Sequence, residues 1–238
     1  MAQRKSRKTR SGKNKKKFSI LRFLFLLAGV FVVLCLLLVL PWRWLTPPVS
    51  AFMLADAFDN GAVAYHWRDI EQISPQLAIA VIASEDQKFP FHHGFDIQEI
   101  RNAMVENRGV RRGASTISQQ VAKNLFLWRG RSYMRKGIEA ILTLIMEMTW
   151  SKKRILEVYL NIAEFAPATY GAEAAALRVY GQKSKILSSK QASLLAAVLP
   201  NPRQLDAAEP SDYVRARAKK IQRQTQKLGG ITYLQNIK

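Results

Sequence analysis

The 238-residue sequence has one cysteine, three histidines and no acidic residue before Asp56. The single cysteine, Cys35, excludes an intramolecular disulfide. His92 and His93 have no third ligand at the spacing of a zinc site, so we expect no metal-binding residues of that kind. Ten of the 37 Lys and Arg residues lie in Met1–Arg22, a segment without an acidic residue, so this segment is strongly basic.

Charge is also missing from a long apolar run, Phe23–Leu40. As a helix this run would be about 27 Å long, close to the ~30 Å of a bilayer's hydrocarbon core. It is longer than the apolar part of a cleaved signal peptide, and no small-x-small cleavage site follows it directly. Pro41 would end the helix, and Trp42 and Trp44 fall where interfacial aromatic residues gather. We therefore predict a retained, single-pass signal anchor.

The positive-inside rule places the basic tail in the cytoplasm and everything after Pro41 on the other side of the membrane. A basic tail is compatible with nucleic acid, but the apolar run directly after it favours a membrane role and no nucleic-acid partner. The rest of the chain is also basic, which predicts an anionic ligand or an anionic membrane surface. The predicted parts are a cytoplasmic tail 1–22, a transmembrane helix 23–40, a linker and membrane-proximal segment 41–72, and one domain 73–238.

Strand-like alternation is absent after Ser74, and so are long internal repeats. The pattern there is helical, so the predicted fold class is all-α with no second domain. Before it, Val49–Glu71 is mixed and contains a turn at 59–61. Asn107–Gly113 reads as a flexible cationic loop, and Gly113 before a helix start offers N–H groups to an anion. We predict helices at 77–83, 97–106, 116–127, 133–150, 152–161, 171–180, 189–199 and 212–228.

One stretch places two acids at a helix end. Ser74 and Pro75 are typical of an N-cap and a first helical position, and the apolar run that follows ends at Glu85 and Asp86. The negative end of the helix dipole disfavours an ionised carboxylate there, which favours proton uptake and hence a general base. An acidic helix end followed by an aromatic loop is the alternative.

A second stretch, Gly113–Asn124, predicts a helix with two stripes. Ile117, Val121 and Leu125 recur on the core-facing side. The other stripe consists of uncharged hydrogen-bonding residues and one cation: Thr116, Gln119, Gln120 and Lys123. Such a composition favours recognition of sugar or phosphate, with an ordinary solvated face as the alternative.

Arg135 and Glu139 are four residues apart on the next predicted helix. Taken alone, this spacing indicates a surface ion pair worth about 0.2–0.5 kcal/mol. The stretch Lys152–Asn161 likewise reads most simply as an amphipathic helix.

Four motifs in order nevertheless resemble one family. They are Glu85-Asp86-x-x-Phe89-x-x-His92-x-Gly94-x-Asp96, Gly113-x-Ser115-Thr116-Ile117-x-Gln119-Gln120-x-x-Lys123-Asn124, Arg135-Lys136-x-x-Glu139 and Lys152-x-x-Ile155-x-Glu157-x-Tyr159-Leu160-Asn161. Together, over residues 73–202, they look like the signature of peptidoglycan glycosyltransferases, specifically the monofunctional biosynthetic transglycosylases.

The resemblance implies a lysozyme-like helical domain that polymerises lipid II into β-1,4-linked glycan. The growing glycan on undecaprenyl pyrophosphate would be the donor, and the GlcNAc 4-hydroxyl of lipid II the acceptor, with inversion. It also implies a catalytic domain on the periplasmic side of the bacterial cytoplasmic (inner) membrane, without a transpeptidase domain. Other cell-wall synthesis or division proteins are possible partners.

The resemblance assigns roles to residues that match its motifs. Glu85 would be the base, and Glu139 the second important glutamate, which would orient cations or help hold a divalent ion, Mg²⁺ or Mn²⁺, at the pyrophosphate. No cofactor beyond that ion is expected. Substrate-binding roles fall on Asp86, Lys88, Phe89, His92, Ser115, Thr116, Gln119, Gln120, Lys123, Asn124, Arg131, Arg135 and Lys136.

One loop departs from the family pattern. Members usually have glycines before the aromatic-Gly pair, whereas this chain has Ala166-Pro167-Ala168-Thr169 before Tyr170 and Gly171. Alanine tolerates a positive φ poorly, so we assign no functional role to this loop.

Two other functions are compatible with the same sequence motifs. A lytic enzyme of the same fold would cleave glycan instead of making it. A membrane-anchored scaffold would retain the motifs only as a binding site.

Overall fold

The computed structural model describes residues 11–99, 101 and 115–237. It divides into two compact units, Met1–Pro41 and Trp42–Lys238. The predicted loop at 107–113, most of the predicted helix at 97–106 and Gly113 lie outside the described residues. The predicted finer boundaries at residues 22, 40 and 72 stay predictions.

The first unit contains the helix α1, Ser11–Val39, which continues as a 3-10 turn, η1, over Leu40–Arg43. Its α-helical part ends two residues before Pro41, as expected from the missing proline N–H. Within the described part of the chain, the helical segment Arg22–Arg43 is long enough and apolar enough to cross a membrane. An anchoring role is thus supported by length and composition.

The second unit is built almost entirely from helices, which confirms the all-α fold class. In chain order they are α2 Ala51–Asn60, α3 Pro75–Glu85, α5 Ile117–Phe126, α6 Tyr133–Thr149, α7 Lys152–Ile162, α8 Ala172–Tyr180, α9 Ser189–Val198 and α10 Asp212–Lys227, with short 3-10 turns η2 Ile70–Gln72, η3 Ser184–Ile186 and η4 Gly230–Asn236. The bounds of α3 and α5 to α10 follow the predicted ones closely because Ser, Thr or Gly residues flank their first turns.

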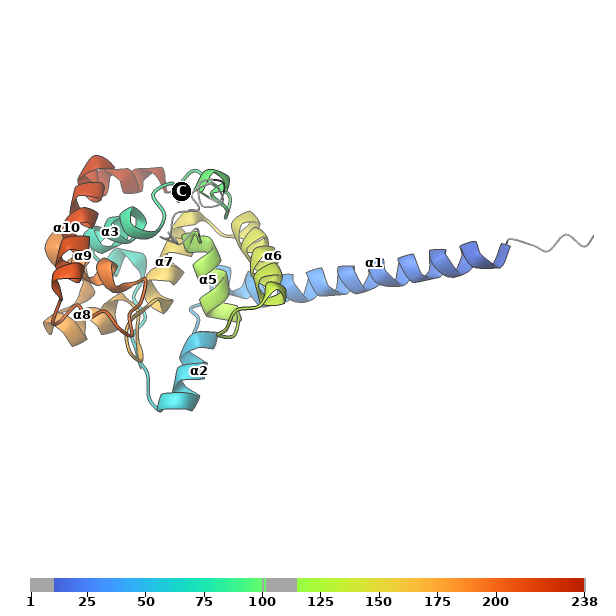
Figure 1. Ribbon diagram of the computed structural model, residues 1–238, viewed down its shortest axis with the longest axis horizontal. Helices are drawn as coiled ribbons and strands as arrows, with labels where there is room; N and C mark the ends of the chain where they lie inside the picture. Colours follow the sequence, from blue (N-terminus) through green and yellow to red (C-terminus); the bar gives the residue numbers. More distant parts are fainter. Residues whose placement is uncertain (1–10, 100, 102–114, 238) are drawn as a thin grey trace, which may run out of the picture. The chain divides into compact units, whose positions relative to one another are not determined.

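Two groups of helices make the core. Helix α3 lies against α9 and α10, and α5 lies against α6 and α7 (Figure 1). Every residue of α3 from Leu77 to Ala83 is buried, so this helix is apolar all round and central. The C-terminal end of α3 also reaches α5 of the other group, through Glu85 and Asp86, and the site forms there.

Two elements were not predicted. Helix α2 begins at an N-cap, Ser50, whose hydroxyl accepts from the Met53 N–H. A small sheet joins β1 Ala64–Tyr65, β2 Glu164–Ala166 and β3 Thr169–Tyr170, with β3 in the middle, parallel to β1 and antiparallel to β2. Strands of two or three residues are too short to leave a period-2 pattern in the sequence.

Candidate functional site

Helix α3 delivers two adjacent carboxylates to its C-terminal end, as predicted. The Ser74 hydroxyl accepts from the Gln76 N–H and Pro75 takes the first position, so the helix start is well defined. Glu85 is the last helical residue and Asp86 follows as the C-cap. Glu85 and Asp86 have different hydrogen-bond partners, and these partners indicate different roles.

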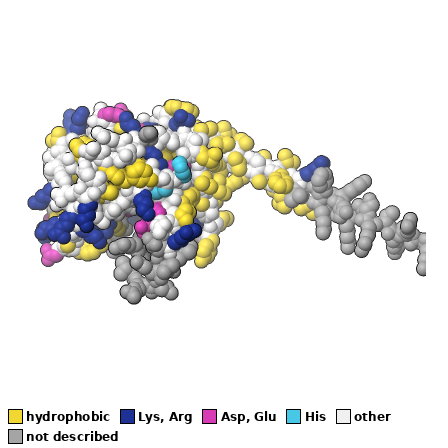
Figure 2. All heavy atoms as spheres, turned by 90° about the horizontal axis from the view of Figure 1, so that it is seen from above, with side chains coloured by type: hydrophobic (Ala, Val, Ile, Leu, Met, Phe, Trp, Pro, Cys, Tyr) yellow, Lys and Arg dark blue, Asp and Glu magenta, His cyan; other side chains and the backbone are white. Residues whose placement is uncertain are grey.

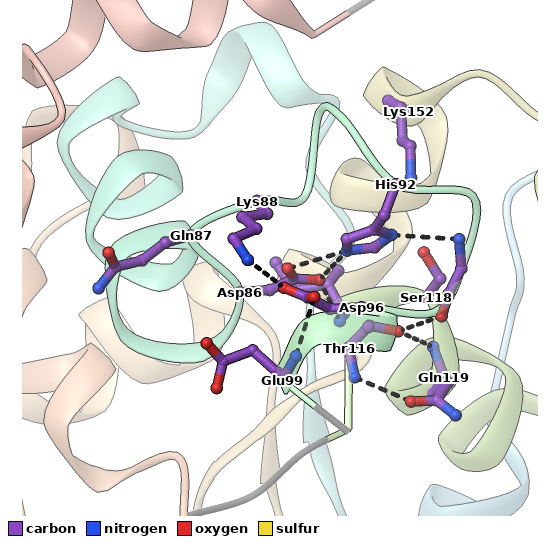
Figure 3. A network of polar contacts seen from close by, with 12 residues as sticks. Asp86, Gln87, Lys88, His92, Asp96, Glu99, Thr116, Ser118, Gln119 and Lys152 are labelled. Atoms are coloured by element: carbon purple, nitrogen blue, oxygen red, sulfur yellow. Dashed lines mark hydrogen bonds and ion pairs between the residues drawn. The ribbon is translucent and has the colours of Figure 1, made fainter. Parts of the chain in front are cut away.

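Asp86 is buried and ties three segments together. One of its oxygens accepts from the Ile117 N–H at 3.0 Å, at the start of α5, and both lie 2.9 Å from His92 Nε2. The Gly94 N–H donates to His92 Nδ1 at 3.1 Å, so Nε2 carries the hydrogen that points to Asp86 (Figure 3). Asp86 and His92, both predicted to bind substrate, are thereby engaged in holding the loop against α5.

Glu85 is held mainly by neutral donors. The Ser84 hydroxyl donates to Oε1 at 2.8 Å, and Gln120 Nε2 donates to Oε2 at 3.0 Å. Gln120 is itself oriented, because its Oε1 accepts from the Tyr159 hydroxyl at 3.2 Å. Among the described residues, Arg217 on α10 pairs with this carboxylate, with its Nη2 3.8 Å from Oε1. Since an ionised carboxylate has about four acceptor positions, Glu85 keeps capacity for a substrate hydroxyl.

The first turn of α5 is occupied by a capping box. Thr116 Oγ1 accepts from the Gln119 N–H, while Gln119 Oε1 accepts from the Thr116 N–H at 3.0 Å. Thr116 Oγ1 also donates to the Gly94 carbonyl at 2.7 Å (Figure 3). Both side chains are buried. In this conformation the predicted sugar or phosphate binders Thr116 and Gln119 stabilise the helix start, and the Thr-x-x-Gln spacing already carried that signal.

The later turns of α5 carry polar side chains that lack hydrogen-bond partners among the described residues. Lys123 is half-buried and has no hydrogen bond or ion pair to any residue that the structure describes. The buried Asn124 Oδ1 has no hydrogen-bond partner among the same residues. Burial lowers the pKa of Lys123, and the charges of Arg135 and Lys136 add to this, against the opposing effect of Glu139 and Glu85.

Helix α6 carries the second glutamate. Arg135 Nη1 donates to Glu139 Oε2 at 2.9 Å, and Lys136 Nζ bonds Oε1 of the same carboxylate. Glu139 is only 2% exposed and Arg135 is also buried. The interpretation of this pair as a surface ion pair is therefore wrong, because this turn of α6 packs inward together with Leu142 and Thr143. Arg135 Nε is buried without a partner among the described residues.

The remaining predicted binding residues lie in different settings. Lys88 is exposed and pairs with Asp96 at 3.4 Å. Phe89 is fully buried, with Lys152 Nζ 4.6 Å from its ring centroid, so in this conformation it packs in the core and has no surface for a substrate. Arg131 is exposed and Ser115 is half-buried.

A network that the motifs did not predict surrounds Asp56 on α2, which is fully buried. Arg129 Nη1 lies 2.6 Å from Oδ1, and Arg203 Nη2 lies 2.6 Å from Oδ1 and 2.7 Å from Oδ2. The Tyr170 hydroxyl donates to Oδ2. Burial alone raises the pKa of Asp56, and the hydrogen bonds from Arg129, Tyr170 and Arg203 more than offset it, so the pKa lies well below its usual range.

The altered loop takes part in this network. Ala168 adopts a positive φ of 51°, the strained conformation that the sequence suggested an alanine would resist. Its carbonyl accepts from the Ala64 N–H at 2.8 Å. Gly171 has φ 85°, and a Cβ there would lie 2.5 Å from the Asn161 carbonyl oxygen. The loop is thus tightly held although it carries alanine where the family usually has glycine.

The implied divalent ion finds a poor donor set here. Both oxygens of Glu139 are taken by Arg135 and Lys136. Within residues 11–99, 101 and 115–237, no three or more His, Cys, Asp or Glu side chains gather as metal ligands would. The described residues do not fit such an ion, and we derive no step through it.

The site therefore combines one carboxylate that retains acceptor capacity with cations on α5, on α6 and in the loop between them. Such an arrangement can accept a proton at one end and stabilise phosphate negative charge at the other. Sequence reasoning missed Arg217, because it lies beyond the last motif and nothing in its local pattern distinguishes it from other basic residues of α10.

Comparisons with known proteins agree with the resemblance that the sequence motifs carry. The family model described as Transglycosylase matches residues 54–226. A biosynthetic peptidoglycan transglycosylase of Xanthomonas campestris pv. campestris (strain B100) is 49% identical over 224 residues, 90% of this chain and 91% of that protein. Proteins of the same name from Xylella fastidiosa (strain M12) and Stutzerimonas stutzeri (strain A1501) are 47% and 50% identical, over 90% and 87% of this chain and 91% and 89% of their own lengths.

Proposed function

Because the chain belongs to the transglycosylase family, we propose that it is a peptidoglycan glycosyltransferase using lipid-linked substrates. The donor is a growing glycan on undecaprenyl pyrophosphate, and the acceptor is the GlcNAc 4-hydroxyl of lipid II. The product is a β-1,4-linked glycan strand.

Glu85 is the general base that takes the proton of the acceptor hydroxyl as the new bond forms. Its orientation supports this role, since Ser84 and Gln120 each donate one hydrogen bond to it and leave other lone pairs for the hydroxyl. Arg217 Nη2, 3.8 Å from Glu85 Oε1, adds a cation beside this carboxylate.

Lys123, Arg131, Arg135 and Lys136 form the donor side, where the pyrophosphate leaves. Negative charge gathers on its oxygens as the glycosidic bond breaks, so preorganised cations stabilise the transition state more than the ground state. Glu139 fixes Arg135 and Lys136 through its two bonds. The chain carries 37 Lys and Arg against 17 Asp and Glu, and Figure 2 shows Lys and Arg side chains at several places on one face. A basic protein suits a pyrophosphate-bearing substrate.

A pyrophosphate leaves without needing a proton, so a single carboxylate suffices. Hydrolysis of a bond between two sugars typically needs a second carboxyl group as acid. Among the residues that the structure describes, Asp86 is hydrogen-bonded to His92 and the Ile117 N–H, and Glu139 is ion-paired with Arg135 and Lys136. This distribution of carboxylates is the observation that favours synthesis over lysis.

The membrane supplies the lipid-borne substrates. We place α1 across the cytoplasmic membrane, with the tail in the cytoplasm and the second unit on the periplasmic side. Trp44, Leu54 and Phe58 of the second unit expose large apolar surfaces, which suits contact with the bilayer. Alkaline phosphatase fused after Lys238 should be active in intact cells, and an inactive fusion of full-length protein would reverse this topology.

Purified full-length protein incubated with lipid II, and separately with isolated sacculi, tests the function. We expect polymeric glycan from lipid II and no release of fragments from sacculi. Cleavage of sacculi without polymerisation would indicate a lytic enzyme, and no change in either substrate would indicate a scaffold.

A further inference from the structure

Helix α2 has an inward face that touches the cations of the site. Phe52 and Asp56 are four residues apart, so they lie on the same side of the helix. Leu54 and Phe58 are also four apart and point outward, with Phe58 88% exposed. The inward pair contacts Lys123 on α5 and Arg129 in the loop after it, whereas the outward pair is exposed.

The Phe52 ring lies next to two cations. Lys123 Nζ is 5.6 Å and Arg129 Cζ is 5.2 Å from the ring centroid. Both distances are within the roughly 6 Å over which a cation is attracted to an aromatic face. Since the Lys123 ammonium has no hydrogen bond or ion pair to a described residue, the Phe52 ring is its aromatic partner in place of a carboxylate.

Arg129, the second cation at the Phe52 ring, is held by the Asp56 network. Arg129 is bonded to Asp56 and donates to the Tyr170 hydroxyl at 2.8 Å. The same hydroxyl lies 3.3 Å from the Phe52 carbonyl oxygen. The network therefore holds the Phe52 backbone through its carbonyl and places Arg129 against its ring.

We infer that Phe52 is a positioning residue for Lys123, holding the ammonium where the leaving pyrophosphate arrives. This inference rests on the proposed function for its consequence in catalysis. A lysine side chain has many rotamers and three donors but no fixed geometry of its own. Without a carboxylate partner, which would neutralise the charge the substrate needs, an aromatic face restricts the side chain and leaves its charge available.

The decisive comparison uses two replacements of Phe52. Phe52→Tyr keeps the aromatic face, and Phe52→Leu keeps an apolar side chain but removes the face. We expect Phe52→Leu to lower kcat/KM on lipid II by about 3- to 30-fold, mostly through kcat, and Phe52→Tyr to stay within about twofold of wild type. Equal activity of all three proteins would overturn the inference.

A double-mutant cycle separates positioning from a general structural effect. In a Lys123→Ala background Phe52→Leu should cause no further loss, because the residue it positions is gone. The same fold-loss in both backgrounds would overturn the inference, since Phe52 would then act on something other than Lys123.

A spectroscopic measurement is independent of activity. In full-length protein carrying ¹³C-labelled lysine, the Lys123 ε-methylene should show a ring-current shift that disappears in Phe52→Leu and persists in Phe52→Tyr. Lys123→Arg identifies the resonance. An unshifted signal in wild type would contradict the geometry, whereas a shifted signal in a protein inactive on lipid II would refute the proposed function alone.

Discussion

Glu85 and Glu139 belong to the same site, and the groups that hold them differ in charge. Glu85 accepts from a serine and a glutamine, with a guanidinium at 3.8 Å. Glu139 is bonded to two cations and is buried. A carboxylate held by neutral donors remains a competent proton acceptor, whereas one bonded to two cations serves to fix those cations. The partners, not the residue type, separate the two roles.

The largest expected effect removes the proton acceptor. Glu85→Gln keeps size and hydrogen bonding but cannot take a proton, and general-base catalysis is worth about 10²–10⁴-fold. We expect lipid II polymerisation to fall at least about a hundredfold, with a melting temperature equal to or slightly above that of wild type.

Polymerisation rates and thermal melting of the same preparations measure both effects. Glu209→Gln is the control, because Glu209 is exposed and lies outside the site. If Glu85→Gln kept a tenth of wild-type activity, Glu85 would not be the base.

The next effect concerns the cation side. Lys123→Ala should cost about 2–4 kcal/mol in kcat/KM, by analogy with the loss of one oxyanion donor. It should lower kcat as well as raise KM, because the interaction strengthens in the transition state. Lys123→Arg should recover only part, since a forked guanidinium does not reproduce a compact ammonium.

Steady-state kinetics of these variants on lipid II decide the matter. The exposed Lys190 on α9 provides the matched control, and Lys190→Ala should stay within about twofold of wild type. If Lys123→Ala had the same small effect as Lys190→Ala, Lys123 would be an ordinary surface lysine.

A smaller effect on stability sharpens the comparison of the glutamates. Glu139→Gln leaves Arg135 buried without its counter-ion, which should lower the free energy of unfolding by about 1–3 kcal/mol. Glu85→Gln should not, because the new amide oxygen can accept from Gln120 while its NH₂ donates to the Ser84 hydroxyl. Thermal or denaturant unfolding in one detergent tests this, and indistinguishable stabilities of the two variants would remove the proposed distinction.

The smallest effect is a shift in pH dependence. Burial lowers the pKa of Lys123 below its usual value, so the charged form is lost, and activity falls, as pH rises through this lowered pKa. Lys123→Arg stays protonated, so its remaining activity should persist to higher pH. Profiles of kcat/KM from about pH 7 to 10 measure the alkaline limb, and identical limbs in both proteins would assign it to another group.

Much of the fold follows from local sequence signals. Ser74 with Pro75, Ser188 and Ser211 begin helices where expected, since each supplies a side-chain oxygen to a first-turn N–H. The adjacent Glu85 and Asp86 at a helix end were likewise predictable from one segment. Helix α2 is not predictable in this way, because its ten residues lie within a segment of mixed composition.

The long-range contacts that distinguish the roles of the site residues could not be predicted from the sequence. Arg203 and Asp56 are bonded across 147 positions, and Arg217 reaches Glu85 from the last α-helix. No local pattern encodes such pairs. Thr116 and Gln119 illustrate a different limit, because a capping box and a sugar-binding stripe use the same residue types, and only their mutual hydrogen bonds distinguish the two.

The central claim is a single displacement with one carboxylate as base, and the anomeric configuration of the product tests it most directly. The polymer made by wild-type protein from lipid II, examined by the one-bond C1–H1 coupling in NMR, should be β-linked throughout, inverted from the α-linked donor. An α-linked polymer would mean that configuration is retained, which a single inverting displacement cannot give, and would contradict the account.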